Sequence, residues 1–318
     1  MNRTARRGLL TAVGAGAALG IHPDLLRLDG RFPLVEVMAW RPHVTLAALT
    51  GAAVLAGHRE CRPAAAVLGA AALAGLAVVT PRAVTARRVP RTHDDLVILN
   101  LNVLRGGADT GELATMIARE APDLVVLSES GTAFRDKLMP LVDGLGYRSW
   151  VSVGPEVRES RGMTLLASLR AGDLQVEGGD DMQCRHLRAT GGILGRRNLF
   201  AVHATAPRDR KRTAAWREDL AVVSQWCRAQ VAPIVAGDLN ATLDHSALRA
   251  TLHRCRSAAT GTGRGLAATY PSSLPRALGI QIDHILVPSG TATSRFEVLD
   301  IAGSDHRAVL ARVRLPVL

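Results

Sequence analysis

Three uncharged apolar runs in the first ninety residues constrain the fold more than any other feature of the sequence. They cover Gly8–Ile21, Val44–Gly57 and Ala64–Thr80. A helix rises 1.5 Å per residue, so about 17–25 residues cross the hydrocarbon core of a bilayer. The third run has this length, and the other two reach it only with flanking residues. We therefore expect residues 1–92 to form a membrane-anchor region of about three transmembrane helices.

Two other interpretations of this region stay open. Met1–Ala18 combines a basic start with a short apolar core, which is also typical of a cleaved signal peptide. Alanine and glycine, which dominate the runs, are only weakly apolar. A helical hairpin outside the membrane is therefore the second alternative.

The arginines of this region predict its orientation. Arg3, Arg6 and Arg7 precede the first run, and basic residues are enriched on the cytoplasmic side of membrane proteins. Three spans from a cytoplasmic N-terminus place the rest of the chain outside. Four arginines between positions 82 and 91 oppose this orientation, because they would then lie on the outer side. On balance the sequence predicts a multi-pass protein of the cell membrane with an extracytoplasmic C-terminal domain.

The distribution of charge makes nucleic acid the less favoured partner. The net charge is +11, but residues 1–92 contain twelve arginines against four acids, so they hold +8 of it. The remaining residues carry only +3, which gives little bulk attraction for a polyanion. Aromatic residues, on which bases stack, make up only 3% of the chain. The four cysteines form no CxxC pair, which argues against a cysteine-based zinc site.

From position 93 onward, short apolar runs of strand length alternate with amphipathic segments. Alternation of this kind is typical of a layered α/β domain, and we expect one over residues 93–318. The predicted helices are 111–120, 134–144 and 208–230. The predicted strands are 96–103, 123–127, 163–169, 199–205, 233–236, 281–287 and 308–314.

Polar residues stand where these apolar runs end. They are Asn102, Glu129, His203, Asp238, Asn240, Asp283, Asp305 and His306. Ligands of open α/β folds bind where strand ends meet loops. Converging carboxylates repel one another unless a cation neutralises them, and oxygen ligands favour Mg²⁺ or Mn²⁺. Each residue alone could be a cap, a turn residue or a hydrogen-bonded core histidine, so the prediction of a site rests on their joint occurrence.

The segments around these residues resemble the endonuclease/exonuclease/phosphatase superfamily, which includes DNase I-like nucleases and inositol-phosphate phosphatases. The resemblance covers Asp94–Leu318 and implies a four-layer α/β sandwich, with two facing sheets flanked by helices, that hydrolyses a phosphoester with a divalent metal. Ser128 departs from the pattern, because many members carry glutamine there. The matching segments are Leu99-Asn100-Leu101-Asn102-Val103, Asp123–Glu129, Val202-His203, Gly237–Thr242, Ile282–Leu286 and Ser304–Val309.

The resemblance also implies a role for each matching residue. The metal ligands are Asn102, Glu129 and Asp305, and the ion is Mg²⁺ or Mn²⁺. Asp238 activates the attacking water. Asp283 fixes the tautomer of His306 and raises its pKa, so that His306 is protonated. His306 and His203 then hold the anionic phosphate. Asn240 lies two residues beyond Asp238, so an extended backbone would point both side chains to the same side, where Asn240 could donate to the phosphoryl oxygens. His284 neighbours Asp283 along a strand and is expected to point away from the site.

Short spans followed by such a domain resemble bacterial envelope members of the superfamily that are associated with lipid-linked phosphates. This implies a membrane-anchored phosphoesterase that acts on a phosphate ester or pyrophosphate, with a polyprenyl pyrophosphate as one candidate substrate. A membrane-tethered endonuclease or exonuclease is the second interpretation, and a catalytically inactive binding module is the third. The basic cluster at 206–212 could hold a diphosphate or could be the solvated start of a helix.

Overall fold

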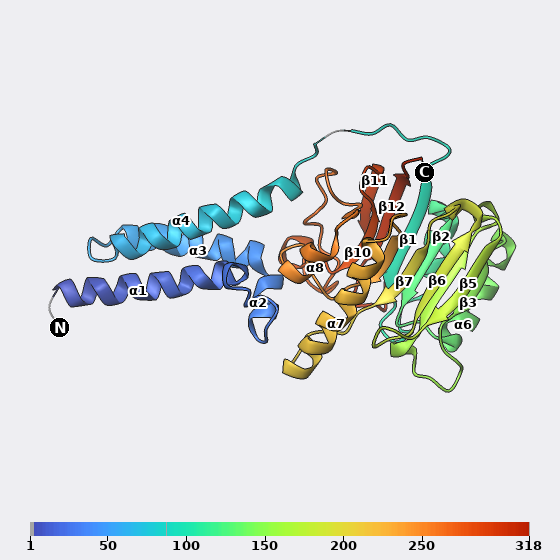
Figure 1. Cartoon of the computed structure of the whole chain (residues 1–318), viewed down its shortest axis with the longest axis horizontal. Helices are drawn as coiled ribbons and strands as arrows, with labels where there is room; N and C mark the ends of the chain where they lie inside the picture. The colour runs from blue at the N-terminus through green and yellow to red at the C-terminus, as the bar shows by residue number, and fades with distance from the viewer. Residues whose placement is uncertain (1–2, 87, 318) are drawn as a thin grey trace.

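Two β-sheets packed face to face, with helices on their outer surfaces, form the body of the protein (Figure 1). This computed structural model describes residues 3–86 and 88–317. The N-terminal helices extend from the body as an arm, and the strands occupy the chain from position 96 onward (Figure 1). The architecture is the α/β sandwich that the resemblance implies.

Each sheet has six strands, with a parallel pair at its centre and antiparallel strands on either side. The first sheet has the order β11 (Ala292–Leu299), β12 (Ala308–Arg314), β1 (Leu96–Asn102), β2 (Leu124–Ser128), β4 (Met163–Ala167) and β3 (Arg148–Val151). The second has the order β5 (Leu174–Gly179), β6 (His186–Gly191), β7 (Leu199–His203), β8 (Ile234–Asp238), β10 (Asp283–Pro288) and β9 (Cys255–Ser257).

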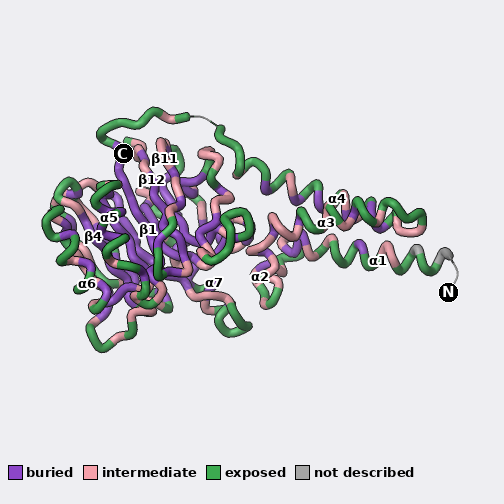
Figure 2. Tube along the Cα trace, turned by 180° about the vertical axis from the view of Figure 1, so that it is seen from behind, coloured by how far each residue is buried: buried purple, intermediate pink, exposed green. Residues whose placement is uncertain are grey.

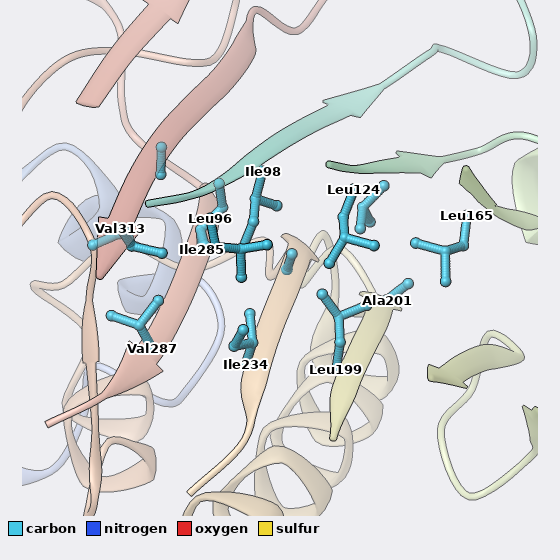
Figure 3. Close-up of a cluster of buried hydrophobic side chains, with 14 of the residues drawn as sticks. Leu96, Ile98, Leu124, Leu165, Leu199, Ala201, Ile234, Ile285, Val287 and Val313 are labelled. Atoms are coloured by element: carbon cyan, nitrogen blue, oxygen red, sulfur yellow. The ribbon is translucent and has the colours of Figure 1, made fainter. Parts of the chain in front are cut away.

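The central strands are continuous apolar runs because both of their faces are covered. In β1, Leu96 and Ile98 point into the layer between the two sheets, whereas Val97 and Leu99 point to the helices outside. Figure 3 shows the inner layer, in which Ile98 meets side chains from the second sheet such as Ile285. The alternation therefore sends every second residue of β1 toward the opposite sheet, and Asn102 lies in that series.

Helices on both outer surfaces bury the remaining apolar faces of the sheets. The helices α5 (Thr110–Glu120) and α6 (Thr132–Val142) cover the first sheet, and α7 (Arg210–Cys227) and α8 (Ser246–Thr251) cover the second. Aspartates start two of these helices, because a carboxylate can accept from a free backbone N–H of the first turn. Asp109 accepts from Glu112 N at 2.8 Å, and Asp209 accepts from Arg212 N at 2.7 Å.

The arm consists of α1 (Arg3–Ile21), α2 (Leu34–Ala39), α3 (Arg41–Ala56) and α4 (Arg62–Val79). The helix α4 packs against both α1 and α3, with a small core around Ile21, Ala52 and Ala72. Much of the outer surface of the arm is exposed although it is apolar (Figure 2). Among the described residues, Leu9, Val13, Val54 and Leu73 are each more than half exposed.

The helix lengths do not support the expectation of about three transmembrane helices. Within the described chain, one helix is long and apolar enough to cross a membrane: Arg62–Ala83, 22 residues that combine α4 with the 3₁₀ turn η2 (Thr80–Ala83). The first apolar helix is shorter, because the chain leaves it at His22 and enters the 3₁₀ turn η1 (Pro23–Leu26). The second, α3, has only 16 residues.

All seven predicted strands are present, with ends that differ from the prediction by at most two residues. The three predicted helices are α5, α6 and α7. The strands β3, β5, β6, β9 and β11 were not predicted, and they are short, glycine-containing or half-exposed. Further 3₁₀ turns are Asp143–Leu145, Glu159–Arg161, Leu169–Ala171, Gly192–Leu194 and Arg276–Leu278.

Candidate active site

The parallel pair β1 and β2 places Asn102 and Glu129 at one end of the first sheet. Asn102 is the last residue of β1 and pairs with Ser128, the last residue of β2. Glu129 follows in the left-handed region at φ 56°, which turns its side chain toward Asn102. Asn102 Nδ2 donates to Glu129 Oε1 at 3.3 Å, and the backbone N–H of Arg105 donates to Glu129 Oε2 at 3.0 Å.

The second sheet contributes three neighbouring residues from three strands. His203 ends β7 and lies beside Asp238, which ends the parallel strand β8. Asp283 starts the antiparallel strand β10 and lies beside Asp238 on the other side. The register alone therefore brings these three side chains together, although they are far apart in the sequence.

Gly237 explains why a glycine precedes Asp238. Its φ is 156°, and a Cβ atom there would lie 1.8 Å from the carbonyl oxygen of Val202. No side chain fits between β7 and β8 at this point, so any other residue would push the strands apart. The glycine therefore keeps His203 and Asp238 close together.

The loop before β12 connects the two sheets at the site. Ser304 Oγ donates to the carbonyl oxygen of Asn102 at 2.6 Å and accepts from the backbone N–H of His306 at 3.0 Å. His306 Nδ1 then lies 2.8 Å from Asp283 Oδ2. The loop is thus attached to the end of β1, while its histidine bonds to the start of β10 in the opposite sheet.

Asp238 Oδ2 is the point at which these groups meet. It accepts from Asn102 Nδ2 at 3.1 Å and lies 3.8 Å from His203 Nε2 and 3.8 Å from His306 Nε2. Glu129 Oε1 is 3.9 Å from His203 Nε2, and Asp305 Oδ1 is 3.9 Å from His306 Nε2. Seven of the eight predicted side chains therefore form one connected cluster.

Burial and neighbouring charges set the protonation of this cluster. Burial would lower the pKa of His306, but the carboxylates of Asp283 and Asp238 outweigh it and raise the pKa to about 10. For His203, burial is likewise outweighed by the Cys184 side chain and by the charges of Asp238 and Glu129, which raise the pKa to about 9. Burial and the nearby Asp283 raise the pKa of Asp238. Both histidines are therefore cationic at neutral pH and face a carboxylate that binds protons more readily than usual.

The extended conformation expected for Asn240 is wrong. The strand β8 ends at Asp238, and Asn240 has φ 47°, in the left-handed region that asparagine tolerates. The carboxylate of Asp238 causes this turn, because its Oδ1 accepts from the backbone N–H of Asn240 at 2.8 Å. The Asn240 side chain donates to the carbonyl oxygen of Ala204 at 2.9 Å, beside the end of β7. It lies at the edge of the cluster and reaches it through its backbone.

His284 lies outside the cluster, as strand alternation predicts. Its Nε2 bonds to the carbonyl oxygen of Ala241 at 2.8 Å, and burial lowers its pKa to about 4. The basic cluster at 206–212 forms the capped start of α7. Ser128, which stands where many family members carry glutamine, lies buried, and its Oγ donates to the carbonyl oxygen of Val202 at 3.4 Å.

Three contributors to the site were not predicted. Ser304 holds the last loop, Cys184 affects the pKa of His203, and the ring of Tyr270 lies 4.9 Å from that of His306. Ser304 stands directly before Asp305 and His306, so this position could have been found from the sequence. Cys184 and Tyr270 lie in loops without any periodic pattern, and only tertiary structure brings them to the site.

The acidic side chains fit a divalent cation. Asp305 Oδ1 is buried and accepts no hydrogen bond, and the side chains of Glu129 and Asp305 are 17% and 39% exposed, so an ion could reach them. Asp238, Asp283 and His306 also have ligand atoms within 4.8 Å of one another. In this second group Asp283 Oδ2 already bonds to His306, whereas Asp283 Oδ1 is buried and accepts no hydrogen bond, so it too could bind an ion. Glu129 and Asp305 are the more exposed of these acids. Hard oxygen donors of this kind suit Mg²⁺ or Mn²⁺.

These residues lie within a segment that matches a known protein family. The profile of the Endonuclease/Exonuclease/phosphatase family matches residues 99–306, a span that contains all eight predicted site residues. Among curated proteins, none matches the chain at a significant level.

Solved structures share the fold at low sequence identity. An endonuclease/exonuclease/phosphatase from Beutenbergia cavernae is 19% identical, with a TM-score of 0.53 and 72% of each chain covered. An AP endonuclease from Leishmania major is 19% identical, with a TM-score of 0.54 over 74% of this chain and 95% of that one. A mannosyl-6-phosphatase from Bacteroides thetaiotaomicron is 15% identical, with a TM-score of 0.51 over 69% of this chain and 100% of that one. At such identities the likeness establishes the fold alone.

Substitution of His284 should change how stability depends on pH. The unfolded histidine binds a proton near pH 6.5, but the folded one does so only near pH 4, so acidification between these values favours unfolding. The full shift corresponds to about 3 kcal/mol. His284→Gln keeps a donor for the carbonyl oxygen of Ala241 and cannot titrate, so its free energy of unfolding should fall less between pH 7 and pH 4. Denaturant unfolding at several pH values measures this, with the exposed His253→Gln as control. Equal pH slopes for His284→Gln and wild type would contradict the expectation.

Proposed function

Because the chain belongs to the endonuclease/exonuclease/phosphatase family, we propose that it is a divalent-metal-dependent phosphoesterase that hydrolyses a phosphate ester or pyrophosphate at a membrane. The observation that carries the proposal is the position of Asp238. Its buried carboxylate lies among the cationic Nε2 groups of two histidines and the amide of Asn102. In this arrangement, a base that can take a proton from water lies beside cationic groups that can bind a phosphate.

Asp238 is the base in this proposal. Its raised pKa makes it a better proton acceptor than an exposed aspartate, which helps it to take the proton of the attacking water. The water oxygen then bonds to phosphorus, and the bond to the leaving oxygen breaks. The hydrogen bond from Asn240 N to Oδ1 leaves Oδ2 to face the site.

The two histidines bind the phosphate and stabilise the charge that develops on it. His306 is held by Asp283 at 2.8 Å, which fixes its ring so that Nε2 faces Asp238 and Asp305. His203 presents its Nε2 from the neighbouring strand end. Preorganised donors in a partly dry site stabilise a transition state more than flexible ones, because they need no reorientation.

Glu129 and Asp305, with Asn102, would hold the divalent cation. A bound Mg²⁺ or Mn²⁺ polarises a phosphoryl oxygen and stabilises the leaving oxygen. Asn102 also donates to both Glu129 and Asp238, so it aligns the ligand with the base. The ligands and the base come from different sheets, and Asn102 is the residue that connects them.

The arm supports attachment to a membrane. Arg62–Ala83 is long and apolar enough to cross one, and the neighbouring helices expose large apolar side chains. The excess positive charge lies in this part of the sequence. A phosphoesterase held there acts on substrates at the bilayer surface, such as a lipid-linked phosphate or a polyprenyl pyrophosphate. The catalytic part is proposed to be extracytoplasmic.

A nuclease is the second candidate, and the fold shared with an AP endonuclease favours it. The low net charge of residues 93–318 opposes it, because nuclease grooves neutralise several phosphates. A catalytically inactive binding module remains the alternative of another class. The proposed base, ligands and charged histidines all occur together in this cluster, and that argues against an inactive protein.

Loss of the base or of the phosphate-binding histidine should abolish hydrolysis without unfolding the protein. We expect Asp238→Ala and His306→Ala each to lower kcat by about 10²–10⁴-fold, the usual contribution of general acid–base groups. Hydrolysis of bis(p-nitrophenyl) phosphate with Mg²⁺ measures the rate, and circular dichroism confirms folding. His253→Ala, at an exposed histidine, is the control. Wild-type turnover in either site variant would refute the assigned roles.

Removal of the metal should stop the reaction, and Glu129 should set the affinity for the ion. A chelator is expected to remove activity and added Mg²⁺ to restore it. Glu129→Gln keeps the size of the side chain but loses its charge, so Mg²⁺ binding should weaken by at least about tenfold in calorimetry. Glu177→Gln, at an exposed glutamate of β5, should bind like wild type. Unchanged affinity in Glu129→Gln would show that the ion lies elsewhere.

The substrate class can be tested with two substrates in parallel. The detergent-solubilised full chain should release phosphate from a polyprenyl pyrophosphate and leave supercoiled plasmid intact. Asp238→Ala serves as the blank for contaminating enzymes. Nicking of plasmid that depends on Asp238, without phosphate release, would instead establish the nuclease.

A further inference from the structure

The arm is joined to the active-site part of the molecule by buried ion pairs. Asp244 lies in the β8–α8 loop (residues 239–245), which directly follows Asp238, and its side chain is only 1% exposed. Arg82 Nη2, just after α4, donates to both of its carboxylate oxygens at 2.7 and 2.8 Å. Arg41 Nη1, at the start of α3, lies 3.8 Å from Asp244 Oδ1. Two cations from the arm therefore neutralise one buried acid of the loop.

Arg41 extends this network through the arm. Its side chain is 2% exposed, its Nη1 donates to Asp24 at 3.3 Å, and its Nη2 donates to His22 Nδ1 at 2.6 Å. His22 Nε2 donates in turn to the carbonyl oxygen of Ala71 in α4 at 2.8 Å. Asp24 also accepts from Arg249 of α8 at 2.9 Å. The network thus runs from the middle of α4 to the helix that follows the β8–α8 loop.

A second set of contacts holds the end of the same loop. Asp29 accepts from Ser246 N at 2.5 Å and from Ser246 Oγ at 2.8 Å, so a residue of the arm caps α8. His245 Nε2 donates to the carbonyl oxygen of Val35 at 2.8 Å. Val35 is fully buried in the same apolar cluster as Leu239 and Trp216. The arm therefore contributes to the core that supports the residues on both sides of Asn240.

The segment after α4 and the helix α3 also contact the loops that precede β10. Gly265 N donates to the carbonyl oxygen of Arg82 at 3.0 Å, and Ala86 N donates to that of Gly261 at 3.0 Å. His43 Nε2 donates to the carbonyl oxygen of Ala277 at 2.9 Å. These loops precede β10, which carries Asp283.

We use the name clasp for the set of contacts that joins the arm to the β8–α8 loop and to α8. It consists of the contacts of Arg41 and Arg82 with Asp244, of Asp24 with Arg249, of Asp29 with Ser246, and of Val35 with His245.

A flexible tether would not bury charges in this way. An ion pair removed from water is favourable only while both partners are present, and loss of one leaves an uncompensated buried charge. If the arm separated from the rest of the protein, Asp244, Arg41 and Asp29 would all lose partners across this contact at the same time. The clasp therefore couples the position of the arm to that of the β8–α8 loop.

We propose that the clasp makes residues 22–86 a working part of the catalytic unit, in which the arm positions the loop that follows Asp238. The loop in turn bonds to the site, because Ala241 accepts from His284 and Leu239 N donates to the carbonyl oxygen of Ile282, next to Asp283. Asp244 and Arg82 are positioning residues. The effect on rate rests on the proposed function, whereas the association of the two parts does not.

Cleavage of the covalent connection tests the association directly. The stretch 88–94 is largely exposed and contains no helix or strand, so a site-specific protease sequence can be inserted between Arg88 and Val89 of the full chain. After cleavage in detergent, we expect the two fragments to stay together on size-exclusion chromatography. Separation of the wild-type fragments would overturn the proposal.

Variants of the clasp show whether its ion pairs hold the parts together. Asp244→Asn and Arg82→Met should let the cleaved fragments separate, whereas Arg82→Lys should retain them because it keeps the charge. Arg82 is partly exposed, so its variants remain informative if Asp244→Asn fails to fold. Asp173→Asn, which removes an exposed ion pair with Arg148, is the matched control. Fragments that stay together in both clasp variants would refute the role of Asp244 and Arg82.

Kinetics then test the positioning role in the uncleaved proteins. A misplacement of a catalytic group by about 1 Å lowers the rate on the order of 10²-fold. Arg82→Met should therefore lower kcat for bis(p-nitrophenyl) phosphate by up to about that factor and change KM little. Arg82→Lys should partly restore kcat. Unchanged kcat in Arg82→Met would overturn positioning. If the wild type hydrolyses nothing, the proposed function fails, and the cleavage result alone still decides whether the clasp exists.

Discussion

The hydrogen bond from Asn102 to Asp238 joins the two halves of the sandwich where the rest of the site is assembled. Asn102 ends a strand of the first sheet and Asp238 ends a strand of the second, so their 3.1 Å contact requires both sheets to be in register. The apolar layer above it supplies that register, because Ile98 and its neighbours pack between the sheets. The packing of the hydrophobic core therefore determines the position of this residue pair, and with it the geometry of the polar cluster.

The polar cluster is stable only because its charges compensate one another. Four carboxylates and two histidines lie within a partly buried volume, and each histidine is held between carboxylates from different strands. The acids keep the histidines charged, and the histidines reduce the repulsion between the acids. A divalent cation would complete this balance at Glu129 and Asp305, where the remaining negative charge is the most accessible. A bound phosphate would then be attracted both by the divalent cation and by the two charged histidines.

Much of the fold and most of the site could be predicted from the sequence, because they depend on local patterns. Strands buried on both faces, such as β1, are continuous apolar runs, and polar residues mark their ends. The strands β5 and β6 could not be predicted, because glycines and exposed positions interrupt their alternation. The turn at Asn240 depends on a hydrogen bond to the preceding aspartate rather than on a strand pattern. Cys184 and Tyr270 reach the site only through tertiary folding.

The arm shows a different limit of sequence analysis. Its apolar runs predict helices well, but a run of apolar residues does not show where a helix ends or what the polar residues between the runs contact. Asp24, Asp29 and Arg41 lie in such a linker and would be expected to face water. Asp29 and Arg41 are instead buried, where Asp29 accepts from Ser246 and Arg41 lies 3.8 Å from Asp244. Asp24 is half-buried and accepts from Arg249 of α8. In the membrane-anchored protein that we propose, this burial couples the orientation of the arm to that of the base, so the fold would set the distance between the bilayer and the reacting phosphate.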